Sequence, residues 1–118
     1  MALYFNLPVY KESYNFLLLI FQFCSKLPRE YKYTLGERLK NESTNVLIKI
    51  FEASNTSASL KQKNIEDALL HLEKCRLYIR LLKDLNIWGV STQAALNQKI
   101  ESISKQLTQW SVYVARVR

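Results

Sequence analysis

The last third of the chain repeats apolar residues at helical intervals. Successive members of this set are separated by four, three, four, three and four residues: Leu96, Ile100, Ile103, Leu107, Trp110 and Val114. Polar residues fill most of the positions between them. This spacing aligns the apolar side chains along one stripe of a helix that packs against a core. It predicts a long helix that begins at Ser91 or Thr92.

The composition extends this prediction to a fully helical domain. Apolar residues make up 48% of the 118 residues, whereas there are only two glycines and two prolines. The chain therefore has material for a core but few of the turn residues that a many-stranded β fold needs. Apolar residues recur at helical spacing in three further segments, residues 9–26, 34–53 and 64–86. Four such helices predict an all-α, antiparallel up-down-up-down four-helix bundle, a single domain over residues 1–118.

The first of these helices is apolar nearly all round. One face, predicted to line the core, contains Tyr10, Tyr14, Leu17, Leu18, Phe21 and Cys24. The other sides carry Phe16, Leu19, Ile20 and Phe23. Because a bundle of this length buries one stripe of each helix, the surplus predicts a second buried surface, most simply between subunits. Packing of the surplus under a loop is the alternative.

The second and third helices have start signals as well as core positions. Thr34 followed by Glu37 has the form of a capping box, and Asn64 with Asp67 opens the third helix. Gly36 is interpreted as a permissive first-turn residue, with close backbone approach as the alternative. The predicted core positions are Leu35, Leu39, Val46, Leu47, Ile50 and Phe51 in the second helix and Ile65, Ala68, Leu69, Leu72, Cys75, Ile79 and Leu82 in the third.

Cysteine usage and the lengths of the apolar runs predict a cytoplasmic protein. Cys24 and Cys75 both stand at core spacing without a CxxC pairing, so they are interpreted as reduced core residues. A regulatory or adventitious disulfide is the alternative. The first residues contain no basic leader segment. The longest apolar run, Phe16 to Phe21, has six residues, and a membrane span needs about 20.

The sequence lacks the residue patterns of common catalytic and metal sites. His71 is the only histidine, which leaves no histidine-based metal cluster. A Cys–His nucleophile pair would need Cys75, whose spacing places it in the core instead. The two glycines, Gly36 and Gly89, form no phosphate-binding loop. We therefore expect a non-enzymatic protein without a metal, a cofactor or a small-molecule substrate.

The chain carries a formal net charge of +7, from 17 lysines and arginines against 10 acidic residues. Such an excess favours a polyanion such as RNA, DNA or an anionic membrane surface. We expect the partner to be RNA, with DNA or an RNA–DNA hybrid as alternatives, and no membrane. A predicted phosphate-binding stripe occupies one face of the third helix, where Arg76, Arg80 and Lys83 stand at i, i+4 and i+7, with Lys74 nearby. The alternative is that these cations pair with Glu73 and Asp84 and favour the negative end of the helix dipole.

A second basic cluster is predicted at the end of the fourth helix, where Arg116 and Arg118 follow Lys105. In the assumed topology we expect this end to meet the loop after the first helix. That loop carries three further cations, Lys26, Arg29 and Lys32. The two groups are predicted to form one basic end of the bundle.

Several segments resemble a known family. They are residues 7–14, 27–39, 75–85 and 106–110, together with the ending Ala115-Arg116-Val117-Arg118, and residues 28–36 (Pro-Arg-Glu-Tyr-Lys-Tyr-Thr-Leu-Gly) are the most specific piece. They are similar to a bacterial four-helix-bundle family. That family includes proteins encoded in intervening sequences of 23S rRNA genes and the accessory variability determinant (Avd) proteins of diversity-generating retroelements. The basic third helix and the ending are most like the retroelement branch.

The resemblance implies a homopentamer of four-helix bundles that binds a reverse transcriptase and its template RNA and supports mutagenic cDNA synthesis. It assigns binding roles to six residues: Lys74, Arg76, Arg80, Lys83, Arg116 and Arg118. The alternative within the family is an rRNA-associated bundle of the intervening-sequence type without a polymerase partner. A third possibility, outside nucleic-acid binding, is a bundle that only contacts other proteins.

Overall fold

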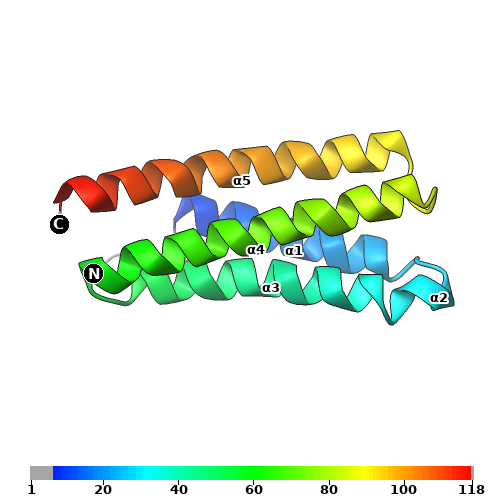
Figure 1. Cartoon of the computed structure of the whole chain (residues 1–118), viewed down its shortest axis with the longest axis horizontal. Coiled ribbons are helices and arrows are strands. Elements are labelled where there is room, and N and C mark those ends of the chain that lie inside the picture. Colours follow the sequence, from blue (N-terminus) through cyan, green and yellow to red (C-terminus); the bar gives the residue numbers. More distant parts are fainter. Residues whose placement is uncertain (1–6, 118) are drawn as a thin grey trace.

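Four long helices and one short helical turn make up the structure. The computed structural model describes residues 7–117, and over this range it contains α1 (Pro8–Cys24), α2 (Arg29–Lys32), α3 (Leu35–Ser54), α4 (Ala58–Asp84) and α5 (Val90–Val117), with no β-strand. The long helices run alternately up and down in a body of 46 × 20 × 20 Å (Figure 1). The predicted all-α, antiparallel four-helix bundle is confirmed. The single turn α2 was not predicted.

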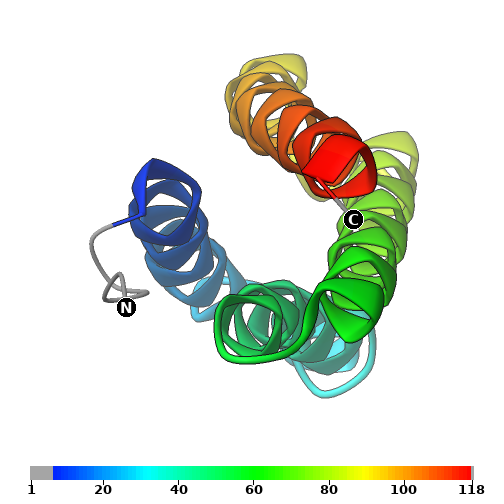
Figure 2. The same cartoon turned by 90° about the vertical axis from the view of Figure 1, so that its left-hand side faces the viewer.

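Viewed along its axis, the bundle is an open ring of helices (Figure 2). α3 packs against both α1 and α4, α4 packs against α5, and the ring closes through a less extensive contact between α1 and α5. At this closure the side-chain amide of Gln106 donates a hydrogen bond to the carboxylate of Glu12. None of the helices within residues 7–117 is both long enough and apolar enough to cross a lipid bilayer.

The two ends of the bundle hold different connections. α2 and the α4–α5 connection lie at one end, and the last turn of α5 lies at the other (Figure 1). The rings of Phe23 and Trp88 pack edge to face at the α2 end, with 5.8 Å between their centroids and 61° between their planes. The predicted single basic end is therefore wrong, because Lys26, Arg29 and Lys32 lie at the opposite end from Arg116. Each connection reverses the chain, so the fourth long helix finishes beside the start of the first.

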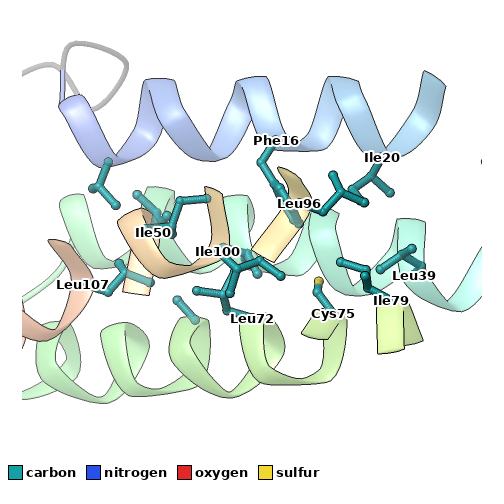
Figure 3. Close-up of a cluster of buried hydrophobic side chains, with 14 of the residues drawn as sticks. Phe16, Ile20, Leu39, Ile50, Leu72, Cys75, Ile79, Leu96, Ile100 and Leu107 are labelled. Carbon is teal, nitrogen blue, oxygen red and sulfur yellow. The ribbon is translucent and has the colours of Figure 1, made fainter. Parts of the chain in front are cut away.

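The core runs along the axis and is built mainly from the positions predicted for the last three long helices (Figure 3). The buried members of that set are Leu39, Val46, Ile50, Ile65, Ala68, Leu72, Cys75, Ile79, Leu82, Leu96, Ile100, Ile103, Leu107 and Val114. The predicted core positions Leu35, Leu47, Leu69 and Trp110 are only half-buried. Phe51 is exposed, which corrects its prediction as a core residue.

The core-facing side of α1 differs from the one predicted, although Cys24 is buried as expected. Phe16 and Ile20 are buried, at 1% and 0% exposure, together with Val9, Ser13 and Cys24. Tyr14, Leu18 and Phe21, predicted for the core, are each nearly half exposed. Because apolar residues occur all round this helix, its periodicity does not distinguish the inner face from the outer one.

The helix starts also differ from the predicted signals. Thr34 precedes α3, but its hydroxyl donates to the backbone oxygen of Glu30 at 3.1 Å and makes no capping bond to α3. α4 begins at Ala58, six residues before Asn64. Lys61 stabilises this extra turn, because its ammonium group donates to the backbone oxygen of Ala53 at 2.6 Å.

Gly36 marks a close approach between the α2 segment and α3. A Cβ atom at this position would lie 3.0 Å from Cδ1 of Leu27 and 3.3 Å from the backbone oxygen of Tyr31. Only a residue without a side chain allows both contacts undisturbed. Close approach, the alternative interpretation of this glycine, is thus the one that the structure shows.

Candidate nucleic-acid interface

The predicted stripe of cations lies on the second half of α4, as the helical spacing required. Arg80 and Lys74 are exposed, and Arg76 and Lys83 are half-buried. Each of the last three turns of α4 therefore presents at least one basic side chain to the surface.

Carboxylates accompany this stripe. Nε of Arg76 lies 3.1 Å from Oε2 of Glu73, and Nη1 of Arg76 lies 2.7 Å from Oε1 of Glu101 on α5. The pairing with Glu73 was the alternative interpretation from sequence. The contribution of Glu101 was missed, because only the packing of α5 on α4 brings residues 25 positions apart together.

The two cations at the end of α4 are also paired with a carboxylate. Nε of Arg80 lies 3.0 Å from Oδ2 of Asp84, and Nζ of Lys83 lies 3.7 Å from Oδ1 of the same residue. Lys74, which lies near the stripe, forms no ion pair with any residue in the described range 7–117.

The guanidinium of Arg76 is the most firmly held of these cations. Partial burial by itself would lower its pKa, but the hydrogen bonds and charges of Glu73 and Glu101 outweigh that effect, and the pKa is raised. A phosphate that bound Arg76 would have to displace two carboxylates.

A groove of about 310 Å³ separates α4 from α5 beside these ion pairs. Its walls combine two guanidinium groups with side-chain amides: Glu73, Arg76, Leu77, Arg80, Gln93 and Asn97. The buried Oδ1 atom of Asn97 has no hydrogen-bond partner among the described residues. The groove therefore offers polar groups of both kinds, although its acidic member opposes an anionic ligand.

The second predicted cluster does not assemble within the described residues. Arg116 is exposed in the last turn of α5, and Lys105 lies eleven residues earlier on the same helix, roughly 16 Å along its axis. Arg118 lies outside the described residues. Within residues 7–117, Arg116 is thus the member of the predicted cluster that lies at the end of the bundle away from α2.

A third basic region surrounds α2, and we call it the α2 surface. It consists of Lys26, Arg29, Lys32, Tyr33 and Arg38. None of its four cations lies within ion-pair distance of a carboxylate among residues 7–117, whereas Glu37 in the same segment pairs with Lys40 at 3.1 Å. Tyr33 is 63% exposed. Sequence reasoning named three of these cations but missed Arg38 and Tyr33, although the interleaving of two cations with two tyrosines over positions 29–33 was a usable signal.

The groups capable of chemistry are held in structural roles. Nδ1 of His71 on α4 lies 2.5 Å from Oε2 of Glu42 on α3, so this pair joins two helices. Both cysteines are buried and free. Within residues 7–117 no three histidine, cysteine or acidic side chains are placed to hold a metal ion together.

The fold and this surface define a class of protein, the basic antiparallel four-helix bundles. A family model, that of the 23S rRNA-intervening sequence proteins, matches residues 6–109, and the chain belongs to this family. No curated protein matches the chain significantly. The family match gives no support to the narrower assignment to the retroelement branch.

Proposed function

We propose that this protein is a non-catalytic RNA-binding bundle that associates with ribosomal RNA and needs no polymerase partner. The observation that carries the proposal is the family match over residues 6–109 in a chain of net charge +7. The name of the family connects it to 23S rRNA, and a positive surface supplies the affinity for a phosphate backbone that such a role requires.

The distribution of charge supports RNA as the partner. Exposed cations without a carboxylate partner in residues 7–117 occur on several elements: Lys11, Lys26, Arg29, Arg38, Lys74, Lys99, Lys105 and Arg116. Cations of this kind bind phosphates with release of counterions from the nucleic acid. Contacts to phosphates position RNA without reading its sequence, so selectivity for one RNA would come from its shape or from unpaired bases.

The retroelement role, with a reverse transcriptase as partner, rests on the resemblance of segments such as residues 75–85 alone. No comparison supports it, and it enters the test below as a competing outcome.

We also propose that copies of the chain associate. Exposed apolar side chains occur on both sides of the α1–α3 seam, and we call them the α1–α3 face: Tyr14, Leu18, Phe21, Ile48 and Phe51. An apolar face of this kind is typical of a surface that another subunit covers. Assembly as a pentamer stays a prediction from the resemblance.

The test is purification of the tagged protein from its host with and without ribonuclease treatment, followed by sequencing of bound RNA and mass spectrometry of bound proteins. We expect 23S rRNA to be enriched over a tagged control protein of equal net charge. Recovery of a reverse transcriptase with a short repeat-containing RNA would favour the retroelement role instead. Absence of any enriched RNA would contradict the proposed function.

A further inference from the structure

We propose that the α2 surface, rather than the α4 stripe, is where this protein contacts RNA, and that it binds unpaired nucleotides. In this arrangement Lys26, Arg29, Lys32 and Arg38 contact phosphates, and the ring of Tyr33 stacks on a base. The inference rests on the proposed RNA-binding function and specifies the site and the kind of RNA.

The first step concerns the availability of the cations. On α4, Arg76, Arg80 and Lys83 each lie within 4 Å of a carboxylate, and Arg76 has two. A phosphate must exchange with these carboxylates before it gains their attraction. At the α2 surface no such exchange is needed, because its four cations have no carboxylate partner among residues 7–117. The only acidic residues over positions 26–38 are Glu30 and Glu37, and Lys40 already neutralises Glu37.

The second step concerns the aromatic side chain. Tyr33 is 63% exposed and directly follows Lys32. Proteins that bind single-stranded nucleic acids combine cations that follow the backbone with exposed aromatic rings on which bases stack. A base inside a duplex is already stacked and cannot use such a ring. The exposed tyrosine therefore selects loops, bulges or ends over paired RNA.

The third step concerns rigidity. Leu27 is buried, Tyr31 packs against the core, and Leu27 with the backbone of Tyr31 closes on Gly36. The amide nitrogens of Tyr31 and Lys32 both donate to the backbone oxygen of Pro28 at 2.9 Å. The backbone that carries the cations and Tyr33 is thus fixed before RNA arrives, which lowers the entropy that binding must overcome.

The α4–α5 groove is the competing site. Its guanidinium groups and amides could hydrogen-bond a base, but Glu73 lines the groove and Glu101 holds Arg76. Both carboxylates repel the phosphate attached to any base that entered. The free cations and the exposed ring favour the α2 surface.

The experiment compares two triple variants of equal net charge. One is K26Q/R29Q/K32Q in the α2 surface. The control is K11Q/K99Q/K105Q, which removes three exposed cations from α1 and α5. Binding of each full-length protein to a short single-stranded RNA, and to the same strand in a duplex, is measured between about 50 and 200 mM salt.

We expect the α2 variant to bind the single strand more weakly than the control variant does. The slope of log affinity against log salt should fall by about 2, because each lost phosphate contact removes about 0.7. If the two triple variants bind alike, the α2 surface is not the site. If the unmodified protein binds neither RNA, the proposed function itself fails, which is a different result.

A second pair of variants tests the stacking contact. Tyr33→Ala is compared with Tyr113→Ala on α5, since the two tyrosines are equally exposed at 63% and 62%. We expect Tyr33→Ala alone to weaken single-strand binding, by roughly 5- to 100-fold, with little effect on the duplex. Tyr33→Phe should bind like the unmodified protein. Equal effects of the two alanine variants would overturn the stacking contact, and thermal unfolding checks that every variant is folded.

Discussion

Cys24 and Cys75 sit in the core as thiols rather than as a reactive pair. Burial raises the pKa of Cys24 to about 11, against a smaller opposing effect of Lys40. Burial likewise raises the pKa of Cys75 to about 12, partly offset by its hydrogen bond with Ser43. The Ser43 hydroxyl donates to the backbone oxygen of Leu39 at 2.8 Å, and the Ser43 oxygen lies 3.4 Å from Sγ of Cys75. Both side chains are therefore neutral packing groups near neutral pH.

This burial predicts a loss of stability in alkaline solution. In the unfolded chain both thiols ionise near pH 9.0, whereas in the folded chain they keep their protons to about pH 11 and 12. Over that window the unfolded state binds fewer protons, so the free energy of unfolding falls as pH rises, by up to about 1.4 kcal/mol per pH unit for each thiol. Urea unfolding from pH 8 to pH 10.5 measures it. The C24A/C75A variant is the control and should show a shallower fall, and equal slopes would contradict the prediction.

At the scale of single elements, α1 shows how packing chooses among equivalent faces. Phe16 and Phe21 belong to the same helix and the same residue type, yet their side chains are 1% and 47% exposed. Periodicity assigned Phe21 to the core. The surrounding helices instead fill the space around Phe16 and Ile20.

The two phenylalanines make a matched test of that assignment. Phe16→Ala should lower the free energy of unfolding by about 3–5 kcal/mol, because it removes a buried ring and leaves a cavity. Phe21→Ala should cost less than about 1 kcal/mol in the isolated bundle, since its ring is already half in solvent. Urea unfolding at low protein concentration compares them. A larger cost at Phe21 would mean that the other face of α1 lies inside.

The contact between His71 and Glu42 connects α4 to α3. Both side chains are about four-fifths buried. The two residues are 29 positions apart in sequence, and their contact joins α3 to α4. A double-mutant cycle with His71→Ala and Glu42→Ala should give a coupling energy of about 1 kcal/mol at pH 7. Lys63→Ala with Asp67→Ala, a pair within α4 whose lysine is exposed, provides the comparison and should couple by less. If the effects of the two single substitutions on the free energy of unfolding add up to that of the double variant, the pair does not stabilise the contact between α3 and α4.

At the scale of the whole molecule, the folded single chain leaves large apolar side chains of α1 and α3 exposed to solvent. The residues of the α1–α3 face are each between 42% and 47% exposed. Lys40 lies over the ring of Phe21 at 5.1 Å, so one charged side chain borders this face. The excess of apolar residues on α1, already visible in the sequence, thus remains at the surface of a single chain.

We expect this face to be buried between copies of the chain. Leu18→Glu should shift the molecular mass in sedimentation toward that of one chain, because it places a charge in the contact, while circular dichroism stays helical. Leu60→Glu in the first turn of α4, where the leucine is also exposed, is the control and should leave the mass unchanged. A single-chain mass for the unmodified protein at all concentrations would contradict the expected association.

The spacing of apolar residues alone predicts the helical class, the number of long helices and most of the inner faces of α3, α4 and α5. Those helices carry one apolar stripe each, so a single orientation buries the apolar residues and leaves the polar ones in water. The core positions from Ile65 to Leu82 and from Leu96 to Val114 followed from spacing alone for this reason. The same spacing placed Arg76, Arg80 and Lys83 on one face of α4.

Three features depend on how the helices pack: the face of α1 that lies inside, the connections that share one end of the bundle, and the cations that have no carboxylate partner among residues 7–117. α1 is apolar on every side, so the choice depends on the shape of the space that the other helices leave. Glu101 meets Arg76 only because α5 packs on α4, and α2 is a single turn held by Leu27 against Gly36. These features depend on contacts between residues far apart in the chain, and the local spacing of apolar and polar residues does not specify such contacts.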